Sequence, residues 1–132
     1  MSKTQTVKAV QEYIQDEFWN ATPEKQIEVF QSLLQELNSI WETQVILHCD
    51  FNNTLQYHRT GGGIYLPYLQ AITLYKASLM TFLHEFAHAL FEGEGEKSEF
   101  QVINWSHKIF KEALPETYAK ALQEKKFFHI VP

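Results

Sequence analysis

The sequence predicts an α+β fold in which a small antiparallel or mixed sheet packs on helices. Apolar residues recur at helical spacing near both ends of the chain, whereas residues 43–75 contain short apolar runs separated by turn residues, as strands do. With 132 residues, of which 45% are apolar, the chain has the size and composition of one domain with a core. We expect this domain to contain an N-terminal helical pair (1–41), a central core (43–113), and a C-terminal helix and tail (114–132).

Two amphipathic helices are predicted before residue 42. The first, over residues 5–18, has apolar residues at helical spacing: Val7, Val10, Ile14 and Phe18. The second begins with Thr22 as N-cap and Pro23 at the first helical position. Its apolar face consists of Ile27, Phe30, Leu34, Leu37 and Trp41. Both helices are expected to act as scaffold for a site elsewhere.

Residues 43–75 are expected to supply the strands. TQVILHCDF (43–51) predicts one strand, and LQYHR (55–59) is expected to pair with it as a hairpin through the turn residues FNNT. The run GGGIYLP predicts an edge strand at 64–66, preceded by glycines and ended by a proline. AITLY (71–75) predicts a further short strand.

Three helices are expected in the remainder of the chain, over residues 77–92, over residues 99–113 and from Pro115 onwards. Gly93 is a natural residue to end the first of them. Ser98 and Gln101 have the spacing of a capping box, which would start the second helix at Glu99.

Charge and composition argue against several function classes. The formal net charge of −5 and the lack of a basic patch argue against a protein that binds nucleic-acid backbones. No apolar run approaches the length of a membrane span, and the N-terminal residues do not resemble a secretory signal. Cys49 is the only cysteine, so no internal disulfide can form, which fits a reducing compartment. The sequence therefore predicts a soluble, cytoplasmic protein.

The fragment LMTFLHEFAHALF (79–91) contains the strongest indication of chemistry. It is apolar on every side except at Thr81, His84, Glu85 and His88, and burying such groups without partners would cost several kcal/mol. Residues i and i+4 lie on one helix face, so both imidazoles can bind one zinc ion. Glu85 lies about 100° around the helix, beside that ion, where it can act as general base on a water molecule. This is the H-E-x-x-H arrangement of zinc hydrolases.

The third zinc ligand is expected among the acids that follow the motif. Glu99 is favoured because it begins a core-facing stripe (Val102 or Ile103, Ser106 and Phe110), where a carboxylate needs a partner. Its alternative role is that of a favourable acid at a helix N-terminus. Glu96, in the preceding loop, is the alternative ligand, and Cys49 is a further conceivable donor within an apolar strand.

The fragments TFLHEFAHALF and EFQVINWSHKIF together resemble the short gluzincins, zinc metallopeptidase-like domains related to the ImmA/IrrE group. That group carries H-E-x-x-H on one helix and a glutamate ligand in an E-x-x-A pattern on the next, and Val102 takes the place of the alanine here. The resemblance covers residues 43–113. It implies a zincin-like minimal metallopeptidase fold with Zn²⁺ as cofactor, His84, His88 and Glu99 as ligands, and Glu85 as general base.

The resemblance also implies a protein or peptide substrate, held in an extended form along the edge strand. The residues it assigns to substrate binding are Gly62, Gly63, Ile64 and Tyr65. Tyr65, His107 and Tyr118 are candidates for a donor that stabilises the oxyanion, with packing roles as the alternative. The function predicted is that of a zinc metallopeptidase, without a nucleic-acid or membrane partner. The alternative is a domain of the same kind that binds a protein or peptide without cleaving it.

Overall fold

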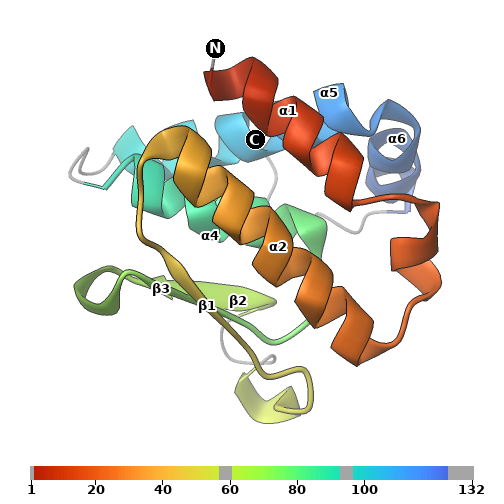
Figure 1. The fold of residues 1–132 in the computed structure, drawn as a ribbon, viewed down its shortest axis with the longest axis horizontal. Helices are drawn as coiled ribbons and strands as arrows, with labels where there is room; N and C mark the ends of the chain where they lie inside the picture. The colour runs from red at the N-terminus through yellow and green to blue at the C-terminus, as the bar shows by residue number, and fades with distance from the viewer. Residues whose placement is uncertain (1, 57–60, 93–96, 125–132) are drawn as a thin grey trace.

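A mixed three-stranded sheet lies against a layer of helices in the computed structural model, which describes residues 2–56, 61–92 and 97–124 (Figure 1). The strand order in this described part is β1-β3-β2. β1 (Ile46–Cys49) runs parallel to β3 (Ala71–Leu74), and β2 (Gly63–Leu66) runs antiparallel to it. The predicted α+β class with a small mixed sheet on helices is therefore confirmed.

The first predicted helix, over residues 5–18, is interrupted in the structure. α1 (Ser2–Tyr13) ends early, and a short 3₁₀ helix, η1 (Asp16–Asn20), follows after an extended residue, Gln15. This break turns Phe18 towards Phe30 of α2 (Pro23–Trp41), with the ring centroids 5.2 Å apart. α2 begins as expected, since the Thr22 hydroxyl accepts a hydrogen bond from the Lys25 backbone N–H at 3.2 Å.

The predicted hairpin between residues 43–51 and 55–59 is wrong. Thr54, Leu55 and Gln56 form a helical turn, and residues 57–59 lie outside the described part of the chain. The cause is local: the Asn53 side-chain oxygen accepts a hydrogen bond from the Gln56 backbone N–H at 3.1 Å, as a helix N-cap does. β1 pairs instead with β3, which lies 25 residues further along the chain, from Ile46 to Ala71.

The two edges of the sheet differ. At the β1 edge, the Leu47 carbonyl accepts a hydrogen bond from the Gln31 side chain of α2 at 2.9 Å, so α2 covers this edge. At the β2 edge, the Gly62 carbonyl accepts a hydrogen bond from the Tyr75 N–H at 2.8 Å. In an antiparallel pair only every second residue hydrogen-bonds to the partner strand, so this bond determines which residues of β2 do so. The backbone groups of Gly63 and Tyr65 consequently point away from β3.

The motif helix is the centre of the core. α4 (Leu79–Leu90) begins with Ser78 as N-cap, and its Phe82 and Phe86 are fully buried. Phe82 stacks on Phe30 of α2 with ring centroids 5.0 Å apart. No helix in residues 2–56, 61–92 and 97–124 has both the length and the apolar character that crossing a membrane requires.

Two further helices follow the motif helix. α5 (Lys97–Ala113) begins two residues earlier than predicted, so Ser98 lies inside the helix and is not its N-cap. Glu99 consequently lies in the first turn of α5, where the backbone N–H groups favour a carboxylate. α6 (Pro115–Gln123) starts at the proline as expected.

The glycines before and within β2 are needed because this segment lies directly against α4. A Cβ atom on Gly62 would lie 2.8 Å from Thr81 Oγ1, and one on Gly63 would lie 2.8 Å from the Thr73 carbonyl oxygen. We expect Gly62→Ala and Gly63→Ala each to lower the free energy of unfolding by about 1–3 kcal/mol, as overpacking does. Chemical denaturation measures this change.

Combining each glycine substitution with Thr81→Ala shows which neighbour each new Cβ atom meets. Thr81→Ala removes the side-chain atoms nearest to a Cβ on Gly62, so the pair Gly62→Ala/Thr81→Ala should recover about 1 kcal/mol relative to additivity. The pair Gly63→Ala/Thr81→Ala should recover less, because the Thr73 backbone remains in the way. Equal recovery in both pairs would contradict this packing.

Candidate metal centre

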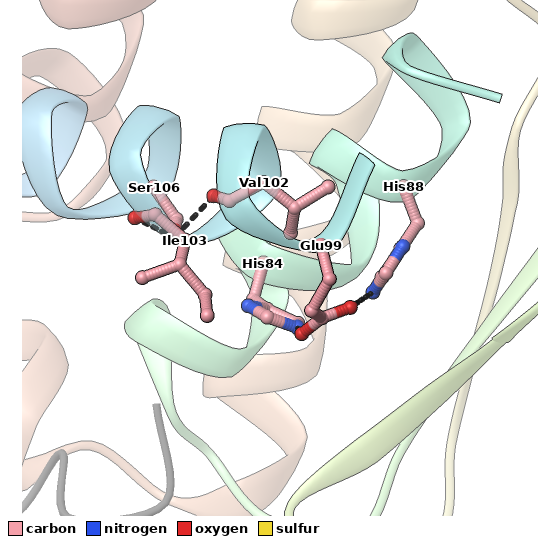
Figure 2. A network of polar contacts seen from close by, with 6 residues as sticks. All are labelled: His84, His88, Glu99, Val102, Ile103 and Ser106. Carbon is pink, nitrogen blue, oxygen red and sulfur yellow. Dashed lines mark hydrogen bonds and ion pairs between the residues drawn. The ribbon is translucent and has the colours of Figure 1, made fainter. Parts of the chain in front are cut away.

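Two helices bring His84, His88 and Glu99 together. Both imidazoles project from α4 towards the Glu99 carboxylate at the start of α5 (Figure 2). His84 Nε2 lies 3.3 Å from Glu99 Oε1, and His88 Nε2 lies 3.3 Å from Glu99 Oε2. One potential ligand atom from each of the three residues lies within 4.8 Å of the others. The predicted ligand set is thus one cluster in space.

The three side chains lie close enough together to hold one metal ion. Two ligand atoms about 2.0–2.2 Å from a tetrahedral zinc ion lie roughly 3.3–3.6 Å from each other. The two imidazole-to-carboxylate distances of 3.3 Å lie at the lower end of this range, and each ends on a different oxygen of Glu99. A charge-assisted hydrogen bond would instead bring nitrogen and oxygen to about 2.7–2.9 Å. The donor set of two imidazoles and one carboxylate is also one that catalytic zinc sites use.

Exposure differs strongly across the cluster. The side chain of His84 is 8% exposed, that of His88 is 27% exposed, and that of Glu99 is 57% exposed. Burial lowers the pKa of His88, with a smaller opposing effect from the negative charge of Glu99. A neutral imidazole is the form that binds a metal. The cluster therefore has a buried nitrogen side and a solvent-facing carboxylate side.

The packing of α5 on α4 explains why Glu99 is in reach. Val102 and Phe110 are buried on the face that α5 turns towards the core, as predicted for the stripe that Glu99 begins. Ser106 is buried on the same helix, and its hydroxyl donates to the Val102 carbonyl at 2.8 Å (Figure 2). The Ser106 hydroxyl thus has its hydrogen-bond partner within α5. The carboxylate of Glu99, at the start of the same helix, faces the histidines.

Glu85 lies beside the cluster in a setting that holds its proton. Its side chain is buried, and this burial raises the pKa of the carboxyl to about 7, with a smaller contribution from the negative charge of Glu99. The Tyr65 backbone N–H donates a hydrogen bond to the carboxylate, which lowers the pKa in part. Because Tyr65 belongs to β2, this bond joins the edge strand to the motif helix.

The raised pKa of Glu85 predicts a pH-dependent stability for the metal-free protein. Below pH 4.5, its ordinary value, the carboxyl is protonated in both the folded and the unfolded chain. Between that value and about 7 only the unfolded chain loses the proton, so the free energy of unfolding falls as the pH rises. Above pH 7 the loss is on the order of 3 kcal/mol.

A neutral residue at this position removes that dependence. Chelator-treated Glu85→Gln should therefore unfold at a higher temperature than the chelator-treated parent at pH 8, and at the same temperature at pH 4. Thermal unfolding followed by circular dichroism across this pH range measures the difference. Melting curves that differ by the same amount at every pH would contradict the raised pKa.

The candidate oxyanion donors have other partners. The Tyr65 hydroxyl donates to Glu92 Oε2 at 3.4 Å. His107 Nδ1 lies 2.7 Å from the Tyr118 hydroxyl, and the two rings meet edge to face between α5 and α6. His107 is eight residues beyond Glu99, about 12 Å along the helix. The contacts of His107 and Tyr118 match the packing alternative, and none of these contacts places an oxyanion donor beside the histidines.

The remaining predicted positions are the residues of β2 and the alternative metal ligands. Gly63 and Tyr65 lie on the face of β2 that packs on α4, whereas Ile64 lies on the opposite face. Cys49 is half-buried in β1, and burial raises the pKa of its thiol to about 11, so the metal-binding thiolate is disfavoured. Glu96, the alternative ligand, lies outside the described residues.

Sequence reasoning missed two contacts beside the motif. One is the hydrogen bond from the Tyr65 backbone to Glu85, and the other is the contact between the Tyr65 hydroxyl and Glu92. Both join β2 to α4. They depend on where the edge strand lies against the helix, and side-chain type carries no information on a backbone donor.

The chain was compared with protein-family models, with curated proteins and with solved structures, and none of them matches. The resemblance to gluzincins consequently rests on the sequence motifs alone.

Proposed function

We propose that the protein is a zinc-dependent hydrolase that cleaves peptide bonds. The observation that carries this proposal is the convergence of two imidazoles on one carboxylate, each 3.3 Å from a different oxygen of Glu99, with a buried glutamate next to them. Glu99 is the third ligand in this proposal, together with His84 and His88.

Zinc held there would act as a Lewis acid that lowers the pKa of a water molecule to about 7. The protein residue that handles the proton is Glu85. With a pKa of about 7, its carboxylate can accept a proton from water near neutral pH and later deliver it to the leaving amine. The hydrogen bond from Tyr65 fixes the position of the carboxylate while it does so.

The edge strand supports a peptide as substrate. The backbone groups of Gly63 and the carbonyl of Tyr65 are directed away from β3, whereas the Tyr65 N–H is used by Glu85. A peptide that pairs with β2 would therefore be held by its backbone and would lie directly beside Glu85. Recognition through the backbone is independent of sequence, so side-chain contacts must supply the specificity.

Cleavage of a mixed peptide library tests this function. Zinc-loaded protein should generate new N-termini that mass spectrometry detects, dipicolinate should abolish them, and added zinc should restore them. Protein that carries one zinc ion per chain and still cleaves no peptide would contradict the hydrolase function and favour a domain that binds peptides without cleaving them.

A further inference from the structure

A cavity of about 260 Å³ is lined in part by Ala89, the residue that follows His88 in α4. Its walls come from the turn after α2, from β2 and the turn that follows it, and from the end of α4. They include Glu42, Thr43, Tyr65, Gln70, Ala89 and Glu92. Pockets for whole small molecules measure about 300–1,000 Å³, so a cavity of this size suits a single side chain.

Two wall residues connect the cavity to the proposed catalytic residues. Ala89 directly follows His88 in α4. Tyr65 contributes its side chain to the cavity, while its backbone N–H donates to Glu85. A peptide that pairs with β2 along the side that faces away from β3 would thus pass Glu85 and Tyr65, a wall residue of the cavity, within a short length of chain.

The chemistry of the walls indicates which side chain fits. Two acidic residues, Glu42 and Glu92, line the cavity, and the lining residues within the described part of the chain include no lysine, arginine or histidine. Glu92 is oriented over the cavity by the Tyr65 hydroxyl, which donates to its Oε2 at 3.4 Å. Val45 and Ala89 provide apolar wall for the stem of a long side chain.

We propose that this cavity binds the cationic side chain of a peptide substrate, an arginine or a lysine close to the cleaved bond. Complementary charge selects the cation, and the limited volume selects one extended side chain. This assignment of substrate class rests on the proposed peptidase function. It also makes a claim about binding that can be measured without catalysis.

Binding of arginine amide tests the cavity directly. Citrulline amide has nearly the same shape, the same α-amino group and an uncharged side chain, so it is the matched control ligand. In NMR titrations of ¹⁵N-labelled protein, arginine amide should shift the backbone amides of Thr43, Gln70 and Ala89 and bind roughly tenfold more tightly than citrulline amide, as expected for two partly exposed ion pairs. Added salt should reduce the difference.

Variants assign this preference to the two carboxylates. Glu42→Gln/Glu92→Gln should reduce the affinity for arginine amide to that of citrulline amide. Glu36→Gln makes the same charge change at an exposed position of α2 outside the cavity and should leave the affinity unchanged. Equal affinity for both ligands, or shifts confined to other parts of the protein, would overturn the assignment.

The peptide library separates the cavity from the proposed function. Zinc-loaded protein should cleave peptides with arginine or lysine at one fixed position from the scissile bond, and Glu42→Gln/Glu92→Gln should cleave these peptides about tenfold more slowly. Cleavage without a basic preference would overturn the cavity assignment and leave the peptidase function standing. If no peptide is cleaved, the peptidase function fails, and the arginine amide titration alone decides the cavity.

Discussion

Replacing Glu85 by glutamine is expected to lower kcat/KM for a cleaved peptide by about 10²–10⁴-fold or more, the usual contribution of a positioned general base. Glutamine keeps the size of the side chain and can still accept the hydrogen bond from the Tyr65 N–H, but it cannot take a proton from water. The zinc content should stay near that of the parent, because Glu85 is not one of the three converging ligands.

The control for this substitution is Glu36→Gln, on an exposed position of α2. It removes the same charge and should retain full activity. The decisive comparison uses kcat/KM and zinc content measured on the same preparations. A Glu85→Gln protein that cleaves at the parental rate would show that another group accepts the proton, and a loss of zinc in this variant would show that Glu85 belongs to the metal shell.

Replacing His84 by alanine is expected to remove the metal. Loss of even a group that only orients a ligand costs 10–100-fold in metal affinity, so loss of one of three ligands should cost at least about 100-fold. Zinc per chain should fall from one to near zero after dialysis against a weak chelator, as measured by mass spectrometry of the metal. Cleavage should be lost in parallel.

His48→Ala provides the matched control. His48 lies in β1 with an exposed side chain and is not part of the His84, His88 and Glu99 cluster. The control should retain zinc and activity. If His84→Ala and His48→Ala keep equal amounts of zinc, the metal is bound elsewhere, and the interpretation of the motif is wrong.

The sequence predicted the parts of the site that depend on local geometry. His84, Glu85 and His88 are placed by the regular spacing of a helix, which needs no knowledge of the rest of the fold. The inward direction of α5 followed from the stripe of apolar residues after Glu99, and Val102 and Phe110 are indeed buried. The position of Glu99 relative to the histidines depends on how two helices pack, so the sequence could only favour it over Glu96.

Features that depend on long-range pairing were not predictable. The alternation in residues 55–59 resembles a strand, but the Asn53 cap stabilises a helical turn at its start. The partner of β1 is β3, and no local pattern indicates which of several short strands will be neighbours. The hydrogen bond from Tyr65 to Glu85 uses a backbone donor and became visible only once β2 was placed beside α4.

The relation between β2 and α4 is what unites the site. The same short strand is the edge of the sheet in the described residues, the donor to Glu85 and one wall of the cavity that Glu42 and Glu92 line. Its close approach to α4 depends on glycines at positions 62 and 63. If the proposed function holds, substitutions that displace β2 should impair peptide binding and proton transfer together, whereas substitutions at Glu42 should change only the choice of substrate.

The most direct test of the zinc centre is anomalous diffraction at the zinc absorption edge from crystals of the zinc-loaded protein. A single strong peak is expected about 2.0–2.2 Å from Nε2 of His84, Nε2 of His88 and a carboxylate oxygen of Glu99. A peak coordinated by His84 and His88 with Glu96 in place of Glu99 would correct the third ligand. No peak between the two histidines would contradict the zinc centre itself.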